Sequence, residues 1–345
     1  MVVPSKLFVH GFPGNYGGAG TELHHQIILW RTMGIEVHLI PSYTGYENEP
    51  LFEPMRQLGV VIHSCNEWEA ISADDVIMGF CNSEFLNHLP VIFQHTRRTV
   101  FINCMTWLFA LEKQRMSEGL IRLFLYQNED VMQTNMPLLK NLNSDPGIRF
   151  QVFSPYFDDT LFPFVKERSE EFFGCGRISR QDSDKYSANT LQIYEYFVAP
   201  VIKRGMFLGF DTKSEAKIGR PFSWITTACD SRLISQQDFY RNCKIVLQPM
   251  DTTENWPRVG FEAMASGSIL VVDDRGGWKK MIEHGKTGWL CRHERDFIYY
   301  ASKMAYEPEL RHEMALAARQ RGLELGGKTR AEESWTKIFE TLVEI

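Results

Sequence analysis

The chain has 345 residues, of which 44% are hydrophobic and 23% charged, and its formal net charge is -6. This length and balance predict two globular domains, each with a buried core. The negative charge disfavours a protein that coats nucleic acid or anionic lipid, because such proteins carry an excess of Lys and Arg. The seven cysteines form no C-x-x-C pair, which disfavours a structural zinc site and a disulfide framework. Without a signal-peptide core or an apolar run of about 20 residues, the expected location is cytoplasmic, and contact with a membrane surface stays open.

The first half of the chain has the pattern of a parallel α/β domain. Residues 6–10 are expected to form a buried strand, which a glycine-rich loop at residues 11–20 follows. Thr21 is expected to cap a helix, and residues 35–40 are expected to form a second strand. Strand, glycine turn, helix and strand form a βαβ unit, which implies a parallel sheet. Further strands are expected at residues 59–63, 75–79, 91–94 and 99–103.

A second α/β series follows a proline-rich stretch at residues 143–170, which predicts a linker between domains. Strands are expected at residues 172–176, 205–209, 244–248 and 268–272, and helices at residues 188–198, 257–266 and, for the most part, 294–344. Open parallel sheets bind ligands at the carboxyl ends of their strands, so each half is expected to carry its site there.

The segment TTENWPRVGFEAMASG at residues 252–267 predicts a loop followed by a helix. Asn255 is the expected N-cap, and Pro257 suits the first turn. Such a helix directs free backbone N–H groups at an anion or a sugar hydroxyl. Glu254 and Glu262 supply carboxylates that accept hydrogen bonds from sugar and ribose hydroxyls. The alternative is a capped surface helix with two solvated glutamates.

Two further segments carry candidate ligand groups. In GCGRISR at residues 174–180, a strand presents Arg177 at its end, and Lys185 follows in the next loop. Two fixed cations would stabilise a departing diphosphate, and the alternative is a charged surface loop. In the first half, Gly17 and Gly18 would let the backbone approach a phosphate closely.

Cofactor and metal sites are not expected. The first loop does not match G-x-G-x-x-G, which disfavours a nicotinamide cofactor. The acidic pairs Asp182/Asp184 and Asp273/Asp274 could hold a metal, but short acidic pairs are usually solvated loops. We therefore expect no metal and no cofactor.

Together these segments resemble glycosyltransferase family 4, the glycosyl transferases group 1, whose members are retaining enzymes with the GT-B fold. The resemblance is strongest over residues 172–292, which include GGWKKMIEHGKTGWL at residues 276–290. It implies two Rossmann-like domains, residues 1–160 and 165–328, with parallel sheets facing across a cleft and a C-terminal helix, residues 330–345, crossing back to the first domain.

The resemblance also implies an activity. The enzyme would move a hexosyl or pentosyl group from a nucleoside diphosphate sugar, its co-substrate, to a hydroxyl of a glycan, a lipid-linked acceptor or a small-molecule glycoside. Glu262 would hold the ribose, and Glu254 would face the donor sugar. Arg177 and Lys185 would bind the diphosphate, so the expected catalytic residues are Arg177, Lys185 and Glu254. The remaining expected donor-binding residues are Gly17, Gly18, Asn255, Trp256, Pro257, Arg258 and Val259.

One departure from the family pattern concerns a first-domain histidine near the donor sugar. The matching stretch, residues 101–107, has none, and Asn103 or Cys104 occupies that place. His95 is the third candidate for its role, although a lone loop histidine is more often structural.

Two alternative functions stay open. The acceptor could be a modified base in nucleic acid, which requires a basic strip on the first domain. The candidate strip residues are Arg97, Arg98, Lys113, Arg115 and Arg122. Alternatively, the protein binds sugar nucleotides without turnover, as a sensor or scaffold.

Overall fold

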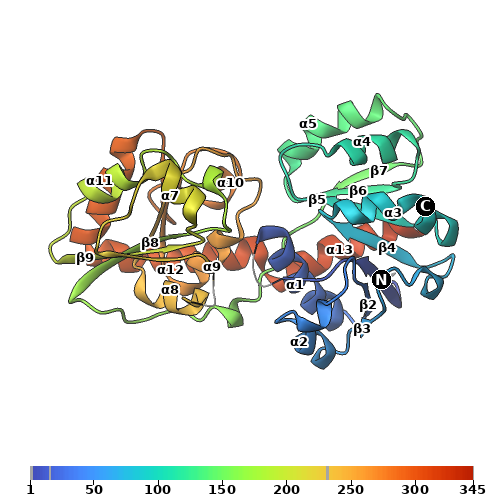
Figure 1. Cartoon of the computed structure of the whole chain (residues 1–345), viewed down its shortest axis with the longest axis horizontal. Coiled ribbons are helices and arrows are strands. Elements are labelled where there is room, and N and C mark those ends of the chain that lie inside the picture. Colours follow the sequence, from blue (N-terminus) through green and yellow to red (C-terminus); the bar gives the residue numbers. More distant parts are fainter. Residues whose placement is uncertain (1–2, 15–16, 231–232, 345) are drawn as a thin grey trace. The chain divides into compact units, whose positions relative to one another are not determined.

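The computed structural model describes residues 3–14, 17–230 and 233–344. The chain forms two compact units: unit 1 comprises Met1–Phe157 and Gly326–Ile345, and unit 2 comprises Asp158–Leu325 (Figure 1). Residues 15 and 16 of the predicted glycine-rich loop lie outside the described residues.

Unit 1 is built on a parallel sheet which, in the described part of the chain, has seven strands in the order β3-β2-β1-β4-β5-β6-β7. The strands are β1 (Lys6–His10), β2 (Glu36–Ile40), β3 (Val61–Ile62), β4 (Val76–Phe80), β5 (Thr99–Asn103), β6 (Leu123–Tyr126) and β7 (Arg149–Val152). The helices are α1 (Gly18–Thr32), α2 (Phe52–Gln57), α3 (Ser83–His95), α4 (Ala110–Ser117), α5 (Glu129–Lys140) and α13 (Lys328–Val343). Apolar residues of α1 and α13 bury one face of the sheet, and those of α3, α4 and α5 bury the other.

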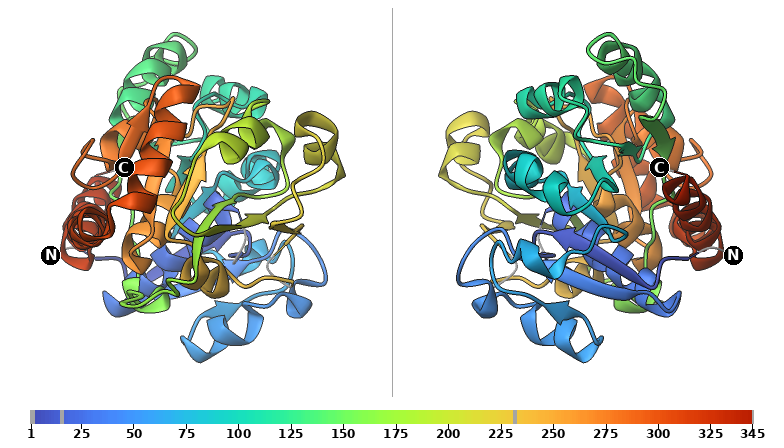
Figure 2. Two further views of the ribbon diagram at one scale, coloured as in Figure 1. Left: turned by 90° about the vertical axis from the view of Figure 1, so that its left-hand side faces the viewer. Right: turned by 90° about the vertical axis from the view of Figure 1, so that its right-hand side faces the viewer.

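The last helix of the chain, α13, belongs to unit 1 and packs against α1 (Figure 2). The indole rings of Trp30 and Trp335 meet edge to face with centroids 4.9 Å apart. The Trp335 Nε1–H donates to Gln26 Oε1 at 2.6 Å, so the polar edge of this buried ring is satisfied. The amphipathic pattern at the C-terminus thus contributes one wall of the unit 1 core.

Unit 2 repeats the architecture with a parallel sheet whose described strands run in the order β10-β9-β8-β11-β12-β13. The strands are β8 (Phe172–Ile178), β9 (Ile202–Leu208), β10 (Ile225–Ala228), β11 (Ile245–Gln248), β12 (Ile269–Asp273) and β13 (Trp289–Cys291). The helices are α6 (Thr190–Tyr196), α7 (Thr212–Ile218), α8 (Gln236–Asn242), α9 (Arg258–Ser266), α10 (Trp278–Met281), α11 (Glu294–Tyr306) and α12 (Pro308–Gly326). Both units are therefore Rossmann-like α/β layers, as the sequence predicted.

One predicted strand is wrong. Residues 91–94 belong to α3, not to a strand, because Asn82 caps this helix and Phe85, Leu89 and Ile92 form its buried face at helical spacing. The predicted linker, residues 143–170, contains the boundary between the units at Phe157 and Asp158, although its first part includes β7, which pairs with β6. A short apolar run does not distinguish strand from helix until its neighbours are known.

Both predicted helix caps are also wrong. The N-cap of α1 is Gly17, whose φ of 89° suits glycine, and Thr21 lies inside the helix with its hydroxyl donating to the Gly17 carbonyl oxygen at 3.0 Å. The N-cap of α9 is Pro257 in place of Asn255. Extended backbone at Pro257 delays the start of the helix by two residues.

Candidate functional site

The predicted residues of unit 2 gather at the carboxyl ends of β8 and β11. The strand order reverses between these two neighbours, since the chain runs outward from β8 to β10 and then returns to β11. Open α/β sheets form their ligand crevice at such a switch point. Arg177 is the penultimate residue of β8, Lys185 ends the short 3-10 turn Ser183–Lys185, and residues 249–257 connect β11 to α9.

Lys185 and Glu254 form an ion pair at this edge. The Lys185 Nζ lies 2.7 Å from Glu254 Oε1, and the two side chains are 17% and 19% exposed. Partial burial strengthens the attraction relative to a fully exposed pair, while both groups stay within reach of solvent. An ammonium group and a carboxylate are thus held side by side where a charged ligand can contact either.

Arg177 is placed differently, because its side chain is fully buried. Its guanidinium donates to the carbonyl oxygens of Pro249 at 3.3 Å and Lys185 at 2.5 Å, and its central carbon lies 3.4 Å from the centroid of the Tyr186 ring. Burial lowers the pKa of this guanidinium from its ordinary value. These contacts tie the Lys185 loop to the end of β11. Binding of diphosphate by Arg177 stays a prediction.

The loop that carries Glu254 rests on two glycines. Gly277 donates its N–H to the Glu254 carbonyl oxygen at 2.8 Å, and a Cβ on Gly277 would lie 2.2 Å from the Asn255 carbonyl oxygen. Gly276 has a φ of +54°, and a Cβ there would lie 2.4 Å from the Glu254 carbonyl oxygen. Sequence reasoning assigned no role to these glycines, although a Gly-Gly pair soon after a strand signals close backbone approach.

Gly277→Ala is expected to displace the loop at residues 254–257 and to lower stability by about 1–3 kcal/mol, the usual cost of an overpacked site. It should also weaken nucleotide binding. Urea unfolding and calorimetry with UDP measure the two effects. Gly18→Ala is the control for stability alone, because its Cβ meets no described atom within 4 Å. Wild-type stability and UDP affinity in Gly277→Ala would contradict the assignment.

A second carboxylate supports the start of the same loop. Asp273, the last residue of β12, accepts from the Met250 N–H at 2.9 Å and lies 3.5 Å from Arg275 Nη2, which also donates to the Met250 carbonyl oxygen. Burial raises the pKa of Asp273 to about 6, although the Arg275 charge opposes this shift. Asp273 therefore anchors the β11–α9 loop through backbone bonds.

In the two acidic pairs that could have held a metal, the carboxylates of Asp182, Asp273 and Asp274 are engaged with protein groups. Asp182 accepts from the Asp184 N–H at 3.0 Å and pairs with Arg180 at 3.0 Å. Asp274 pairs with Arg292 at 2.6 Å. Over the described ranges, no group of three His, Cys, Asp or Glu side chains could hold a metal ion.

Glu262 lies in the second turn of α9 and is 4% exposed. Its Oε2 accepts from the Tyr240 hydroxyl at 2.8 Å. Burial raises the pKa of Glu262, whereas the Tyr240 bond and the Arg258 charge lower it. Of the other predicted donor-binding residues, Trp256 lies in the preceding loop, and Arg258 and Val259 begin α9. Binding of a ribose by Glu262 stays a prediction.

Except for His95, the predicted residues of unit 1 lie at the carboxyl ends of the strands in their own sheet. Gly17 and Gly18 start α1 after β1, and a Cβ on either would meet no described atom within 4 Å, so this backbone is open to a ligand. Asn103 ends β5, and Cys104 follows it. His95 ends α3 shortly before the chain enters β5, which places it near the amino ends of the strands, opposite to their carboxyl ends. His95 is therefore too remote to replace the family histidine.

Asn103 forms a buried network with Glu112 of α4, in which its Nδ2 donates to Glu112 Oε2 at 2.8 Å. The same Oε2 accepts from the Phe109 N–H at 3.2 Å. Burial of Glu112, which is 0% exposed, raises its pKa to about 7 despite these two donors. The network closes the loop that follows β5.

Glu112→Gln is expected to remove part of the pH dependence of stability. Between the ordinary glutamate pKa of 4.5 and the folded pKa of about 7, the folded chain binds more protons at Glu112 than the unfolded chain. The free energy of unfolding therefore falls as pH rises through this window, by up to about 3 kcal/mol. The glutamine side chain of the variant does not titrate, so the variant should gain stability over the wild type between pH 5 and about pH 8. A difference in free energy of unfolding between Glu112→Gln and the wild type that stays constant from pH 5 to pH 8 would contradict this prediction.

The basic strip required for a nucleic-acid acceptor is largely neutralised. Arg98 lies 3.9 Å from Asp74, Arg115 2.6 Å from Glu118, and Arg122 2.7 Å from Asp145. Side chains already paired with carboxylates attract phosphate less. No observation here favours a nucleic-acid acceptor.

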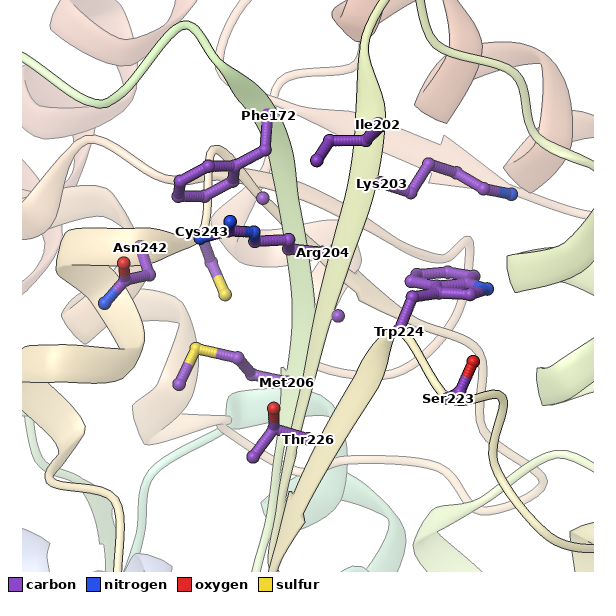
Figure 3. A pocket seen from close by; sticks show the side chains of 12 residues that line it. Phe172, Ile202, Lys203, Arg204, Met206, Ser223, Trp224, Thr226, Asn242 and Cys243 are labelled. Atoms are coloured by element: carbon purple, nitrogen blue, oxygen red, sulfur yellow. The ribbon is translucent and has the colours of Figure 1, made fainter.

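A cavity of about 590 Å³ lies elsewhere on unit 2 (Figure 3). Phe172, Ile202, Arg204 and Asn242 are among its lining residues, and the Arg204 guanidinium covers the Phe172 ring at 4.3 Å. Phe172 and Ile202 begin β8 and β9, so the cavity lies along the amino-terminal parts of these strands. It is separate from the switch point that holds Lys185 and Glu254.

Two Rossmann-like units, each built on a parallel sheet, are the components of the GT-B fold. Residues 235–321, which include Glu254 and Glu262, match the family model described as Glycosyl transferases group 1. No curated protein matches the chain. Among solved structures, Anabaena HepE with UDP and glucose shares 14% identity (TM-score 0.73, covering 99% of this chain and 100% of that one). TarM shares 12% identity, with a TM-score of 0.74 over 98% of this chain and 99% of that one. The sucrose-phosphate synthase of Thermosynechococcus elongatus shares 11% identity, with a TM-score of 0.66 over 99% of this chain and 100% of that one.

At these identities the structural likeness shows the fold, and the family match lies within unit 2. Fold and match together indicate a glycosyltransferase. No helix in the described ranges is long and apolar enough to cross a membrane.

Proposed function

We propose that this protein is a retaining glycosyltransferase that transfers a hexosyl or pentosyl group from a nucleoside diphosphate sugar to an acceptor hydroxyl. The observation that carries the proposal is the Lys185–Glu254 ion pair, 2.7 Å long, at the switch point of unit 2 and ahead of α9. HepE and TarM have been solved with UDP, and HepE also with UDP-glucose, which supports a nucleotide-sugar donor.

In this proposal the Lys185 ammonium group binds the diphosphate, and its ion pair with Glu254 breaks. The Glu254 carboxylate can then accept hydrogen bonds from hydroxyl groups of the donor sugar. The bond between the sugar C1 and the phosphate oxygen breaks while the acceptor oxygen bonds to C1 from the same face. The acceptor proton passes to the departing diphosphate. Lys185 stabilises the growing negative charge on the diphosphate, and the backbone N–H groups at the start of α9 stabilise it further. Arg177 holds the backbone of Lys185 and so positions that residue, in addition to its predicted contact with the diphosphate.

A thermal-shift screen with UDP- and GDP-sugars tests the donor, because a ligand that binds only the folded state raises apparent stability. NMR of the product then reads its anomeric configuration, and inversion would refute the retaining mechanism. Donor binding with neither hydrolysis nor transfer would instead support a sugar-nucleotide sensor.

Dialysis against EDTA is expected to leave the transfer rate within about twofold of the untreated protein, because Lys185 and backbone N–H groups supply the positive charge that a metal would otherwise supply. The control is a second sample dialysed without chelator. A rate that EDTA abolishes and Mn²⁺ or Mg²⁺ restores would show that the reaction needs a metal.

A further inference from the structure

The loop at residues 104–109, which follows β5, presents an aromatic ring to solvent at the carboxyl edge of unit 1. Trp107 is 52% exposed. Its apolar neighbours turn inward, since Cys104 packs against the core on the α1 side and Leu108 and Phe109 pack against the core on the α3 side. The exposure of Trp107 therefore does not come from a loop that has detached from the core.

Buried polar side chains hold this loop in one conformation. The Asn103 Oδ1 accepts from the Met105 N–H at 2.7 Å, and the Asn103 Nδ2 donates to the Trp107 carbonyl oxygen at 3.0 Å. Glu112 closes the other end through the Phe109 N–H at 3.2 Å. Because the backbone on both sides of Trp107 is fixed, a ligand that binds the indole ring loses little free energy in ordering the loop.

The loop also leaves the sheet at the same end as the glycine-rich loop of unit 1, because β5 and β1 are parallel strands of one sheet. β5 is two strands from β1 in the order β1-β4-β5. Neighbouring strands are about 4.8 Å apart, so the loop starts roughly 10 Å from the end of β1, from which the chain leads to Gly17 and Gly18. Trp107 thus follows a strand at the end of the sheet from which the chain also leads to the predicted donor-binding residues of unit 1.

We propose that Trp107 is a stacking platform for a sugar ring of the acceptor, so that the acceptor is itself a saccharide; this rests on the proposed function. The flat C–H face of a pyranose packs on an aromatic ring, while its hydroxyl groups stay free for hydrogen bonds or transfer. A membrane surface fits the loop less well, because it needs several apolar side chains and a basic cluster. Arg115 on the adjacent α4 is already paired with Glu118 at 2.6 Å.

A glycan array and transfer kinetics test this inference, with the donor found by the thermal-shift screen. The wild type should bind and glycosylate saccharides in preference to octanol and dioleoylglycerol. Trp107→Ala should raise the KM for the saccharide roughly tenfold while kcat changes less than about twofold, since stacking binds ground and transition states alike. Trp107→Phe should recover most of the affinity. Tyr299→Ala, at a 61% exposed aromatic on α11, is the matched control.

An unchanged KM in Trp107→Ala would overturn the inference, and so would a wild type that binds no glycan on the array or prefers octanol or dioleoylglycerol. Donor hydrolysis without acceptor and UDP affinity are measured on the same proteins. If the wild type lacks both, the proposed function itself fails. If both persist in Trp107→Ala while the KM for the acceptor rises, the effect belongs to the acceptor.

Discussion

Lys185→Ala is expected to lower the rate of glycosyl transfer by about 10²–10³-fold, the range observed when one stabilising group is removed from a developing negative charge. The Lys185 Nζ is the cation that lies beside Glu254 at the switch point of unit 2. Because it would act on the leaving diphosphate, the loss should appear mainly in kcat. Initial rates at saturating donor and acceptor measure it.

The matched control is Lys303→Ala. Lys303 of α11 forms an ion pair of the same length, 2.7 Å, with Glu307 at the C-cap of this helix, and lies outside the proposed site. Its removal should leave transfer unchanged. Arg177→Ala should also slow transfer, but with a loss of stability, because it removes a buried guanidinium that bonds two carbonyl oxygens. Normal turnover in Lys185→Ala would remove this residue from the mechanism.

Glu262→Ala is expected to weaken binding of UDP or GDP by roughly 10- to 100-fold, the equivalent of losing a hydrogen bond to a charged group. Titration calorimetry with each nucleotide measures this. A fall in kcat at saturating donor should be much smaller, because a ribose contact stabilises ground and transition states alike.

Tyr240→Phe separates ribose binding from a packing effect. Tyr240 donates to Glu262 at 2.8 Å, so this variant removes the hydroxyl and keeps the carboxylate. Its stability should fall by about 1 kcal/mol, and its nucleotide affinity should stay within about threefold of the wild type. Equal losses of affinity in both variants, or none in Glu262→Ala, would show that Glu262 serves the packing of α8 on α9 alone.

Much of the fold was predictable because it depends on local patterns. Buried runs such as residues 6–10 and 99–103 are strands in the structure, and the segment at residues 252–267 is a loop followed by a helix. Periodicity and glycine placement report such elements without knowledge of their neighbours. Errors arose where a short stretch was interpreted without the residues before it: α1 already begins after Gly17, and residues 91–94 continue a helix that begins after Asn82.

The sequence by itself determined the two α/β halves, the residue types at the carboxyl edges and the segment that matches the glycosyl transferases group 1. Only the tertiary structure decided that Lys185 pairs with Glu254, 69 residues away, that Arg177 is buried against carbonyl oxygens, and that Gly277 supports Asn255. These contacts follow from strand order and from the close approach of distant backbones. Neither leaves a periodic signal in the chain, because periodicity records which face of an element is buried and not which element lies against it.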